Sequence, residues 1–344
     1  MPDIGEKYTD AALEGLRRRL RQVYSDAQRD VAMKLSSFEH AHRERVKKHL
    51  AEVREGKITQ EDFKAWMRGQ VFQREQWQKK QQQVAEIMAH VDEQAMAMLN
   101  DGKVDVFAEN ANFMGWQLES GAGTDFGFGL YNQDAVRRLI RNNDDLLPRP
   151  KIDKAKDYEW YNRIVNDAVT QGILQGEALD DIMLRIANDT GERSINAMLR
   201  NARTAYTGAQ NAGRQTAMRQ LEDKGVRVQK EWAAFHDSST REAHAELDGQ
   251  RVDVDQPFHS MLGDIMYPGD PSPDVDPRNV YNCRCTIVYH FPNYPDSSGD
   301  RAEEDERSFE RWKARKESGK KAFDPSMGIW VTGPRSNIDQ RRRR

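Results

Sequence analysis

The stretch that decides the fold reads Trp232-Ala-Ala-Phe-His236-Asp237-Ser-Ser-Thr240-Arg241-Glu-Ala-His244, continues as Leu247-Asp248-Gly249-Gln250 and closes on Asn282-Cys283-Arg284-Cys285. Both cysteines of the 344-residue chain lie at its end, and half of the eight histidines lie within it or just past it. Two cysteines one residue apart do not make a disulfide framework. Thiols beside histidines indicate metal binding in a reducing compartment.

A structural zinc site is the first interpretation of these side chains. His244, Cys283 and Cys285 are ligands of the types that zinc prefers, with Asp237 or His236 as the candidate fourth ligand. A Cys-x-Cys pair is less diagnostic than Cys-x-x-Cys, but a metal here would fasten the long loop 253–282 to the segment that carries His244. The cofactor prediction is therefore one structural zinc ion and no other group.

Two catalytic interpretations compete with the zinc site. In the first, Cys283 or Cys285 is a nucleophile, His244 is its base and Asp237 orients the base. In the second, Asp237, Arg241, His244 and Asp248 perform hydrolysis or group transfer. Neither arrangement comes with a visible device for stabilising an oxyanion. We therefore predict that the protein is not an enzyme, and keep an enzyme acting on nucleic acid or peptide through His244 and Cys283/Cys285 as the alternative.

A purely structural role, in which these polar residues form hydrogen bonds that hold the loops together, is the remaining interpretation. It is compatible with a zinc site. Arg241 would pair with Asp237 or Asp248, while Gly249 and Gly269 would supply turns. If the segment is helical, the spacing puts Asp237, Arg241 and His244 on one face. The residues assigned to this structural motif are Trp232, Arg241, Asp248, Gly249 and Asn282.

The regions around the motif predict a mainly α protein with a small C-terminal α+β module at 225–292. Residues 225–232 switch to the period-two pattern of a strand, and segments at 252–254 and 286–289 look like further strands. Upstream, residues 151–224 predict a helical bundle with helices at 157–172, 177–188 and 192–221. A module of this size needs a metal or a partner to secure its core.

Residues 1–150 predict an extended helical docking region built on a long hairpin. One helix is expected over 11–53, Gly56 breaks it, and Thr59 with Asp62 forms a capping box for a second helix that Asp101-Gly102 ends. A domain boundary is expected at the Pro-containing linker 147–150. Residues 293–344 predict a charged surface helix carrying Phe309 and Trp312, followed by a basic tail.

Positive charge is local. The net charge of −3 argues against general nucleic-acid binding, whereas residues 195–230 hold seven Lys/Arg against two Asp/Glu. Two interpretations remain open for these charges: a solvated helix face, or contact with nucleic acid or an acidic partner. The residues predicted for such contact are Arg200, Arg203, Arg214, Arg341, Arg342, Arg343 and Arg344. A free DNA-binding protein is a third functional class. The sequence has no apolar run near 18 residues and no secretory signal, so no membrane association is expected.

Two motifs resemble the phage head morphogenesis proteins, the Mu F-like minor capsid proteins of tailed phages. The first is Ala202-Arg203-Thr204-Ala205-Tyr206 with Asn211-Ala212-Gly213-Arg214, in which Ala205 stands where glutamate is usual. The second is the ordered series from Trp232 through Pro268-Gly269-Asp270-Pro271 to Cys285. The resemblance covers about residues 155–290 and leaves the N-terminal 150 residues outside it.

The resemblance implies a minor head protein present in few copies. Its expected place is the virion, inside the capsid at the portal vertex, after assembly in the host cytoplasm. Its expected role is in head assembly, DNA packaging or delivery of the genome. Its expected partners are the portal protein, a scaffold or major capsid protein, and packaged DNA. Some relatives carry C-terminal toxin domains, but the residues after His290 are too few and too charged for a typical enzyme domain.

Overall fold

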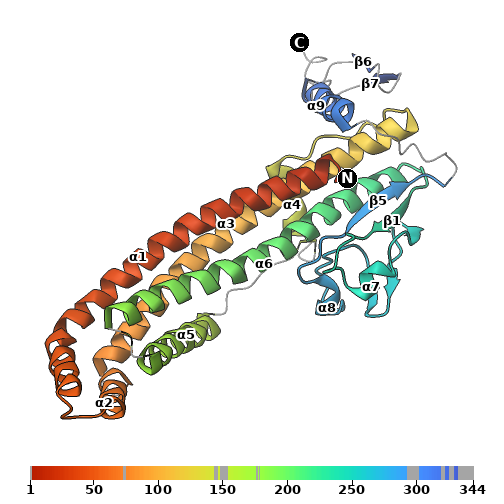
Figure 1. Ribbon diagram of the computed structural model, residues 1–344. Coiled ribbons are helices and arrows are strands. Elements are labelled where there is room, and N and C mark those ends of the chain that lie inside the picture. The colour runs from red at the N-terminus through yellow and green to blue at the C-terminus, as the bar shows by residue number, and fades with distance from the viewer. Residues whose placement is uncertain are drawn as a thin grey trace. The chain divides into compact units, whose positions relative to one another are not determined.

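The computed structural model describes residues 2–72, 75–142, 146–147, 154–175, 177, 179–292, 302–318, 322–324 and 329–331 (Figure 1). The described residues are mainly helical, with a long helical N-terminal region, a central helical bundle and a small C-terminal module containing an antiparallel sheet. The predicted fold class is confirmed.

Long helices account for most of the chain. They are α1 (Ile4–Arg54), α2 (Gln60–Phe72), α3 (Glu75–Ala122), α4 (Gln133–Asn142), α5 (Lys154–Gln175), α6 (Leu179–Glu222) and α9 (Ala302–Ser318). The short helices α7 (Glu242–Ala245) and α8 (Pro277–Val280) belong to the C-terminal module.

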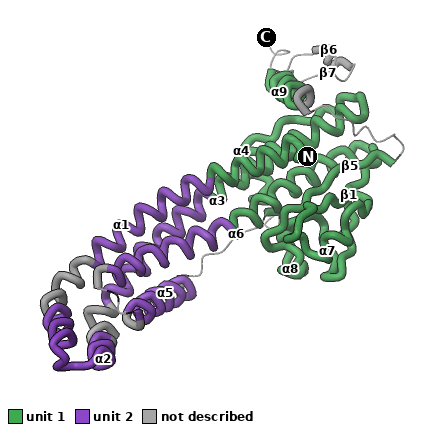
Figure 2. The backbone as a smooth tube through the Cα atoms, in the orientation of Figure 1, with its two compact units in different colours: residues 1–15, 99–150, 200–344 green, residues 16–98, 151–199 purple. Residues whose placement is uncertain are grey.

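The chain divides into two compact units made of non-contiguous segments (Figure 2). Unit 1 comprises residues 1–15, 99–150 and 200–344, and unit 2 comprises residues 16–98 and 151–199. Helices α1, α3 and α6 therefore contribute residues to both units. The boundaries expected at residues 150, 224 and 292 remain predictions.

In unit 2, α1 and α3 lie antiparallel as predicted, but the single second helix expected from residue 60 to Asp101 is divided into α2 and α3. Tyr24 donates a hydrogen bond to Asp92, and Lys80 donates to the backbone carbonyl of Lys34, so residues later in α1 face residues earlier in α3. Apolar side chains at helical spacing, such as Val31 on α1 and Met88 on α3, have no exposed surface. The hairpin therefore buries one stripe of each helix.

The turn before α2 forms as the sequence predicts. Gly56 has a φ of +69°, which ends α1. The Asp62 backbone N–H donates to Thr59 Oγ1 at 3.0 Å, and the Thr59 N–H donates to Asp62 Oδ2 at 3.0 Å. These reciprocal hydrogen bonds are the expected capping box.

The predicted helix end at Asp101-Gly102 is wrong, because α3 continues to Ala122. Glycine at 102 allows close packing rather than chain termination. A Cβ atom there would lie 1.9 Å from the Tyr206 hydroxyl oxygen on α6. The short helix expected near residues 104–118 is therefore the second half of α3.

The two helices predicted at 177–188 and 192–221 are also one helix, α6. Gly191 stays helical, and a Cβ atom at this position would lie 2.3 Å from Gln28 Nε2 on α1. Local propensity suggested a break, but the helix uses this glycine to approach its neighbour closely.

In unit 1, strands β1 (Gln229–Ala233), β2 (Arg251–Asp253) and β5 (Thr286–His290) form an antiparallel sheet in the order β2-β1-β5. The β1–β5 register runs from Gln229 opposite His290 to Ala233 opposite Thr286. The hairpin β3 (Phe258–Ser260) and β4 (Gly263–Ile265), and the pair β6 (Ala322–Asp324) and β7 (Ile329–Val331), were not predicted. Their three-residue strands are too short to show periodicity.

No helix among the described residues is both long enough and apolar enough to cross a membrane.

Candidate metal centre and its supporting network

Three potential metal ligands meet at the start of β5. His244 lies on α7, and Cys283 and Cys285 directly precede the strand. The sulfur atoms of Cys283 and Cys285 lie 3.5 and 3.6 Å from His244 Nδ1, and the three ligand atoms all lie within 4.8 Å of one another. The residues are only 1–3% exposed. The structure thus brings together the three residues that the sequence nominated first.

The hydrogen bonds of Asn279 fix the state of the His244 ring. His244 Nε2 lies 3.1 Å from the Asn279 carbonyl oxygen and 3.2 Å from Asn279 Oδ1. Asn279 Nδ2 donates to the carbonyl oxygen of Gly263, so its Oδ1 is the atom that faces the ring. Because both neighbours of Nε2 are acceptors, the hydrogen-bond network assigns the proton to Nε2. The lone pair of Nδ1 then points at the sulfur atoms, as in a metal-binding histidine.

The thiol groups are electrostatically unequal. The side-chain hydrogen bond with Cys283 is the largest cause that lowers the pKa of the Cys285 thiol below its ordinary value, while burial opposes the shift. The same thiol–thiol hydrogen bond, with burial, raises the pKa of Cys283. The Cys285 backbone N–H donates to Cys283 Sγ at 3.3 Å. One sulfur is therefore prepared as a thiolate, and the second has a backbone donor that would stabilise its ionised form.

The geometry fits a metal such as zinc. In a tetrahedral site with bonds of about 2.3 Å to sulfur and about 2.05 Å to nitrogen, the sulfur and nitrogen ligands lie about 3.6 Å apart. Both sulfur–nitrogen separations in the cluster, 3.5 and 3.6 Å, agree with that value. A divalent ion with two thiolates and a neutral imidazole is neutral overall, which makes its burial less costly.

The candidate fourth ligands lie elsewhere. Asp237 forms an ion pair with Arg284 at 2.6 Å, and His236 lies 3.1 Å from Asp248 with 75% of its side chain exposed. Among the described residues, the cluster contains His244, Cys283 and Cys285 alone. Asp237 precedes the four-residue helix α7, so the single helical face expected for residues 237–244 does not form.

The structural-motif residues surround the cluster. The Trp232 ring packs edge-on against the His244 ring with centroids 5.4 Å apart, and Arg241 donates to the carbonyl oxygen of Tyr281. Asp248 accepts a hydrogen bond from the Ala234 N–H at 2.8 Å. Two backbone positions require left-handed geometry, with φ values of +74° at Gly249 and +55° at Asn282. The expected pairing of Arg241 with Asp237 or Asp248 is replaced by contacts to the backbone.

Asn211 on α6 holds the two loop ends of the module. Its Nδ2 donates to the carbonyl oxygens of Pro268 and Cys285 at 3.1 and 3.2 Å, and its Oδ1 accepts from the Ile287 N–H at 2.9 Å. The loop approaches so closely that a Cβ atom at Gly269 would lie 2.6 Å from the backbone nitrogen of Gly208. One buried amide therefore replaces hydrogen bonds that a larger sheet would supply.

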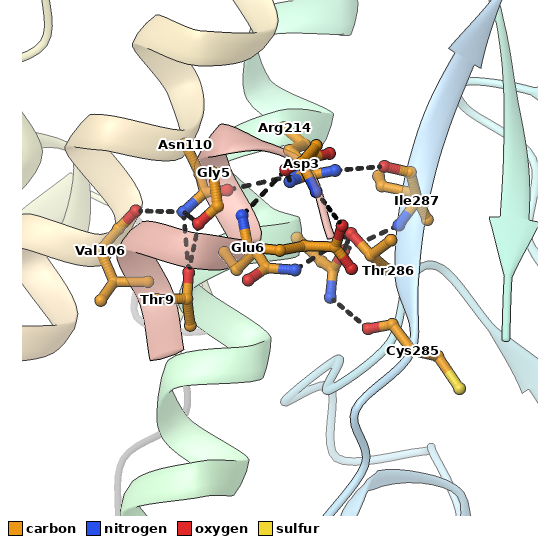
Figure 3. Close-up of polar contacts among 12 residues, drawn as sticks. Asp3, Gly5, Glu6, Thr9, Val106, Asn110, Arg214, Cys285, Thr286 and Ile287 are labelled. Atoms are coloured by element: carbon orange, nitrogen blue, oxygen red, sulfur yellow. Dashed lines mark hydrogen bonds and ion pairs between the residues drawn. The ribbon is translucent and has the colours of Figure 1, made fainter. Parts of the chain in front are cut away.

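Arg214, one turn further along α6, joins three segments (Figure 3). Its guanidinium donates to Asp3 Oδ1 at 2.7 Å, Asn110 Oδ1 at 3.2 Å and the Ile287 carbonyl oxygen at 3.2 Å. Arg214 has no exposed side-chain surface, so the structure places it in the core and not on the predicted surface stripe. A Cβ atom at Gly5 would lie 2.4 Å from Asn110 Oδ1. The N-terminal segment is thereby fitted against α3 and α6.

The other basic residues differ in exposure. Arg200 is exposed and Arg203 is half-buried on α6. Residues Arg341–Arg344 lie outside the described part of the chain, so their predicted contact with nucleic acid or a partner remains a prediction.

Sequence reasoning missed the roles of Asn211, Arg214 and their partners. Asn211 and Arg214 are three residues apart on a helix face that also carries Gly213, where a Cβ atom would lie 2.5 Å from the Phe107 carbonyl oxygen. A glycine between two polar residues on a small-residue face was the available signal of burial. Nothing in the sequence paired Arg214 with Asp3, which is separated from it by 211 positions.

Comparisons with known proteins concern the segment that contains this network. Residues 163–288 match the family model "Phage Mu protein F like protein". The chain is 31% identical over 195 residues to "Minor head protein GP7" of Bacillus phage SPP1, which covers 56% of this chain and 61% of that protein.

A second relative carries an enzyme's name. The chain is 31% identical over 180 residues to "NAD(+)--arginine ADP-ribosyltransferase EFV" of Enterococcus faecalis, which covers 50% of this chain and 34% of that protein. The chain thus matches less than two thirds of the length of either relative. No solved structure is significantly similar to the chain.

The family match contains the whole motif region of α6, the strand β1 and the three clustered ligands, and it agrees with the likeness to a named head protein. Residues 163–288 therefore match the Mu F-like family model, and the chain is similar there to a phage minor head protein.

Proposed function

We propose that the protein is a minor head protein of a tailed phage, located inside the virion after assembly in the host cytoplasm. The observation that carries the proposal is the match of residues 163–288 to the Mu F-like family, together with the identity to the SPP1 minor head protein. Its partners would be the portal protein at one vertex and a scaffold or major capsid protein, and it would support head assembly, DNA packaging and genome delivery.

The structure supports a binding role for the family segment. The module 225–292 is held by buried side chains of α6 that bind loop carbonyl groups, including Asn211 and Arg214. This rigidity suits a surface that docks onto a large assembly, because little conformational entropy is lost on binding. The helices of the N-terminal region are the proposed docking arm for the portal or scaffold.

Virion composition and portal binding test different parts of this proposal. Quantitative mass spectrometry of purified particles should find a few copies of the chain per head, and its absence would contradict the assignment as a head protein. Purified chain should also co-sediment with portal rings of the same phage. A chain that is present in heads but does not bind the ring would contradict portal association alone.

We further propose that His244, Cys283 and Cys285 hold one structural zinc ion. The supporting observation is the pair of sulfur–nitrogen separations that match a tetrahedral site. A bound ion would connect α7 to the segment before β5, so that closing the loop and folding the module become one event.

Elemental mass spectrometry of purified protein tests the zinc site. About one zinc per chain is expected in the wild type and none in a Cys283→Ser/Cys285→Ser variant. The matched control is His259→Ala, which removes an exposed histidine paired with Asp264 and should leave the zinc in place. Wild-type protein without zinc would contradict the site and leave a hydrogen-bonded thiol–imidazole cluster.

The name of the second relative makes catalysis worth one direct test. His244, Cys283 and Cys285 are almost fully buried, so a substrate has no access to the thiols in this conformation. We therefore propose that the module is not catalytic. Incubation with NAD and an arginine-containing acceptor should release no nicotinamide, and measurable turnover that is lost in the double cysteine variant would favour the enzyme.

A further inference from the structure

Within unit 1, helix α9 packs against α3 through one buried face. Phe309 and Trp312 have no exposed surface. The Phe309 ring lies 5.7 Å from the rings of both Phe113 and Trp116 on α3, edge-on to the former. The surface helix expected from the sequence therefore exists, but its two aromatic side chains form a core with α3.

Polar atoms in the same contact are tightly matched. Glu119 on α3 has no exposed surface, and it accepts hydrogen bonds from Trp312 Nε1 at 2.6 Å and Lys316 Nζ at 3.0 Å. Lys316 also donates to Asp125 at 2.9 Å. An unpartnered ammonium group at this depth is strongly destabilising, so Lys316 needs the acceptors that Glu119 and Asp125 provide.

Charge is distributed in a complementary way along the contact. The receiving surface offers Glu109, Glu119 and Asp125, whereas α9 offers Lys313 and Lys316. Lys313 Nζ lies 2.8 Å from Glu109 Oε1 near the edge of the contact. Aromatic anchors at the centre with charged pairs beside them are the pattern of a specific protein interface.

The contact joins parts of the chain that are far apart in sequence. Its polar pairs are separated by 191 to 204 positions, and nine residues, 293–301, stand between the last described residue of the module and α9. An identical helix from a neighbouring chain offers the same contacts at no loss of interface energy. Exchange of a terminal element between copies is a low-cost route to association.

We propose that α3 carries a helix receptor, formed by Glu109, Phe113, Trp116, Glu119 and Asp125, that takes α9 of a second copy of this chain when copies are close together. The receptor recognises an amphipathic helix that presents phenylalanine, tryptophan and lysine at the spacing of positions 309, 312 and 316. The exchange would join neighbouring copies through the same contacts that close the single chain.

Isotope-mixed cross-linking of the full-length protein tests the exchange. Unlabelled and ¹⁵N-labelled chains are mixed at increasing concentration and treated with a carbodiimide, which joins carboxylates to amines in ion pairs. Mass spectrometry then separates Lys313–Glu109 cross-links into single-isotope and mixed-isotope products. We expect the mixed share to rise with protein concentration toward one half of the product.

The same lysine supplies the matched control. Lys313 also pairs with Glu310 within α9 at 2.7 Å, and this cross-link has no mixed form by helix exchange. A mixed share for Lys313–Glu109 that stays at zero at every concentration would overturn the proposal. A mixed share that Trp312→Ala leaves unchanged would also overturn it, because the association would then not use the receptor.

Discussion

Arg214 in unit 1 and Asp92 in unit 2 show how differently two regions of this protein satisfy buried charge. Arg214 binds a carboxylate, a side-chain amide and a backbone carbonyl oxygen from three distant segments. Asp92 accepts hydrogen bonds from the hydroxyl groups of Tyr24 and Tyr161, which lie on the helices α1 and α5. Both side chains lie within a packed region, but of the two only Arg214 forms a hydrogen bond with a backbone group.

The difference follows from the kind of backbone in each region. A helix satisfies its own N–H and C=O groups, so the helices of unit 2 need few side chains for that purpose. The loops of the module have carbonyl groups that lie outside the helices and strands, and side chains of α6 donate hydrogen bonds to them. Thr207 donates to the carbonyl oxygen of Cys283 at 2.8 Å, and Gln215 donates to that of Val254 at 2.6 Å. Small loop-rich modules therefore depend on polar side chains that bind loop carbonyl groups, whereas helical hairpins depend on the apolar side chains buried between their helices.

Removal of the proposed metal should produce the largest difference in stability between the module and unit 2. Chelation of the proposed zinc should lower the stability of the module by at least about 5 kcal/mol, because structural zinc sites contribute about 10 kcal/mol or more. Hydrogen exchange followed by mass spectrometry should show loss of protection at residues 229–233 and 286–290. Residues 84–98 in unit 2 should keep their protection, and equal losses in both regions would break the comparison.

Arg214→Met should have the next largest effect. The variant leaves the Asp3 carboxylate, Asn110 Oδ1 and the Ile287 carbonyl oxygen without their donor, so we expect a loss of about 3–5 kcal/mol in the free energy of unfolding. Urea denaturation measures it. Arg200→Met, exposed on the same helix, is the control and should change stability by less than about 0.5 kcal/mol. A similar small change in both variants would show that the network is dispensable.

Glu119 should make the stability of unit 1 depend on pH. Burial raises the pKa of Glu119 to about 7, with Lys316 opposing the shift and Asp125 adding to it. Because the folded pKa is above the ordinary value of 4.5, the folded state holds the proton more tightly than the unfolded state. The resulting stabilisation, about 3 kcal/mol, is complete below about pH 4.5 and is lost as the pH rises to about 7.

Glu119→Gln should remove this slope, since the amide keeps an acceptor for Trp312 Nε1 but does not titrate. The free energy of unfolding, measured by urea denaturation between pH 4.5 and 7.5, checks it. Glu109→Gln, on the same helix, should retain the slope. If Glu119→Gln stability still falls across this range as in the wild type, another group is responsible.

Tyr24→Phe in unit 2 should have the smallest effect of these changes. Asp92 Oδ1 loses one donor but keeps its partial access to water, and Tyr161 still donates to Oδ2, so we expect a loss of about 1–2 kcal/mol. Thermal unfolding followed by circular dichroism measures it. A loss as large as that of Arg214→Met would show that unit 2 also depends on buried polar side chains for its stability.

Much of the architecture was predictable because the helices repeat an apolar pattern over many turns. The helix expected over 11–53, the capping box at Thr59 and the strands expected over 225–232 and 286–289 correspond to α1, the observed cap, β1 and β5. The errors fell at Gly102 and Gly191, where glycine suggested an end but serves close helix packing. Propensity cannot distinguish these roles, since the packing partner is distant in sequence.

The sequence alone determined the helical class, the position of the sheet module and the three residues of the His–Cys–Cys cluster, because each rests on periodicity or on residue types with few alternative uses. The tertiary structure alone decided that Arg214 is buried, that Asn279 sets the ring state of His244, and that Asp237 and His236 lie outside the cluster. The burial of Arg214 and the ring state of His244 depend on hydrogen bonds between segments separated by 211 and 35 positions. A local pattern holds no information about which distant donor meets which acceptor.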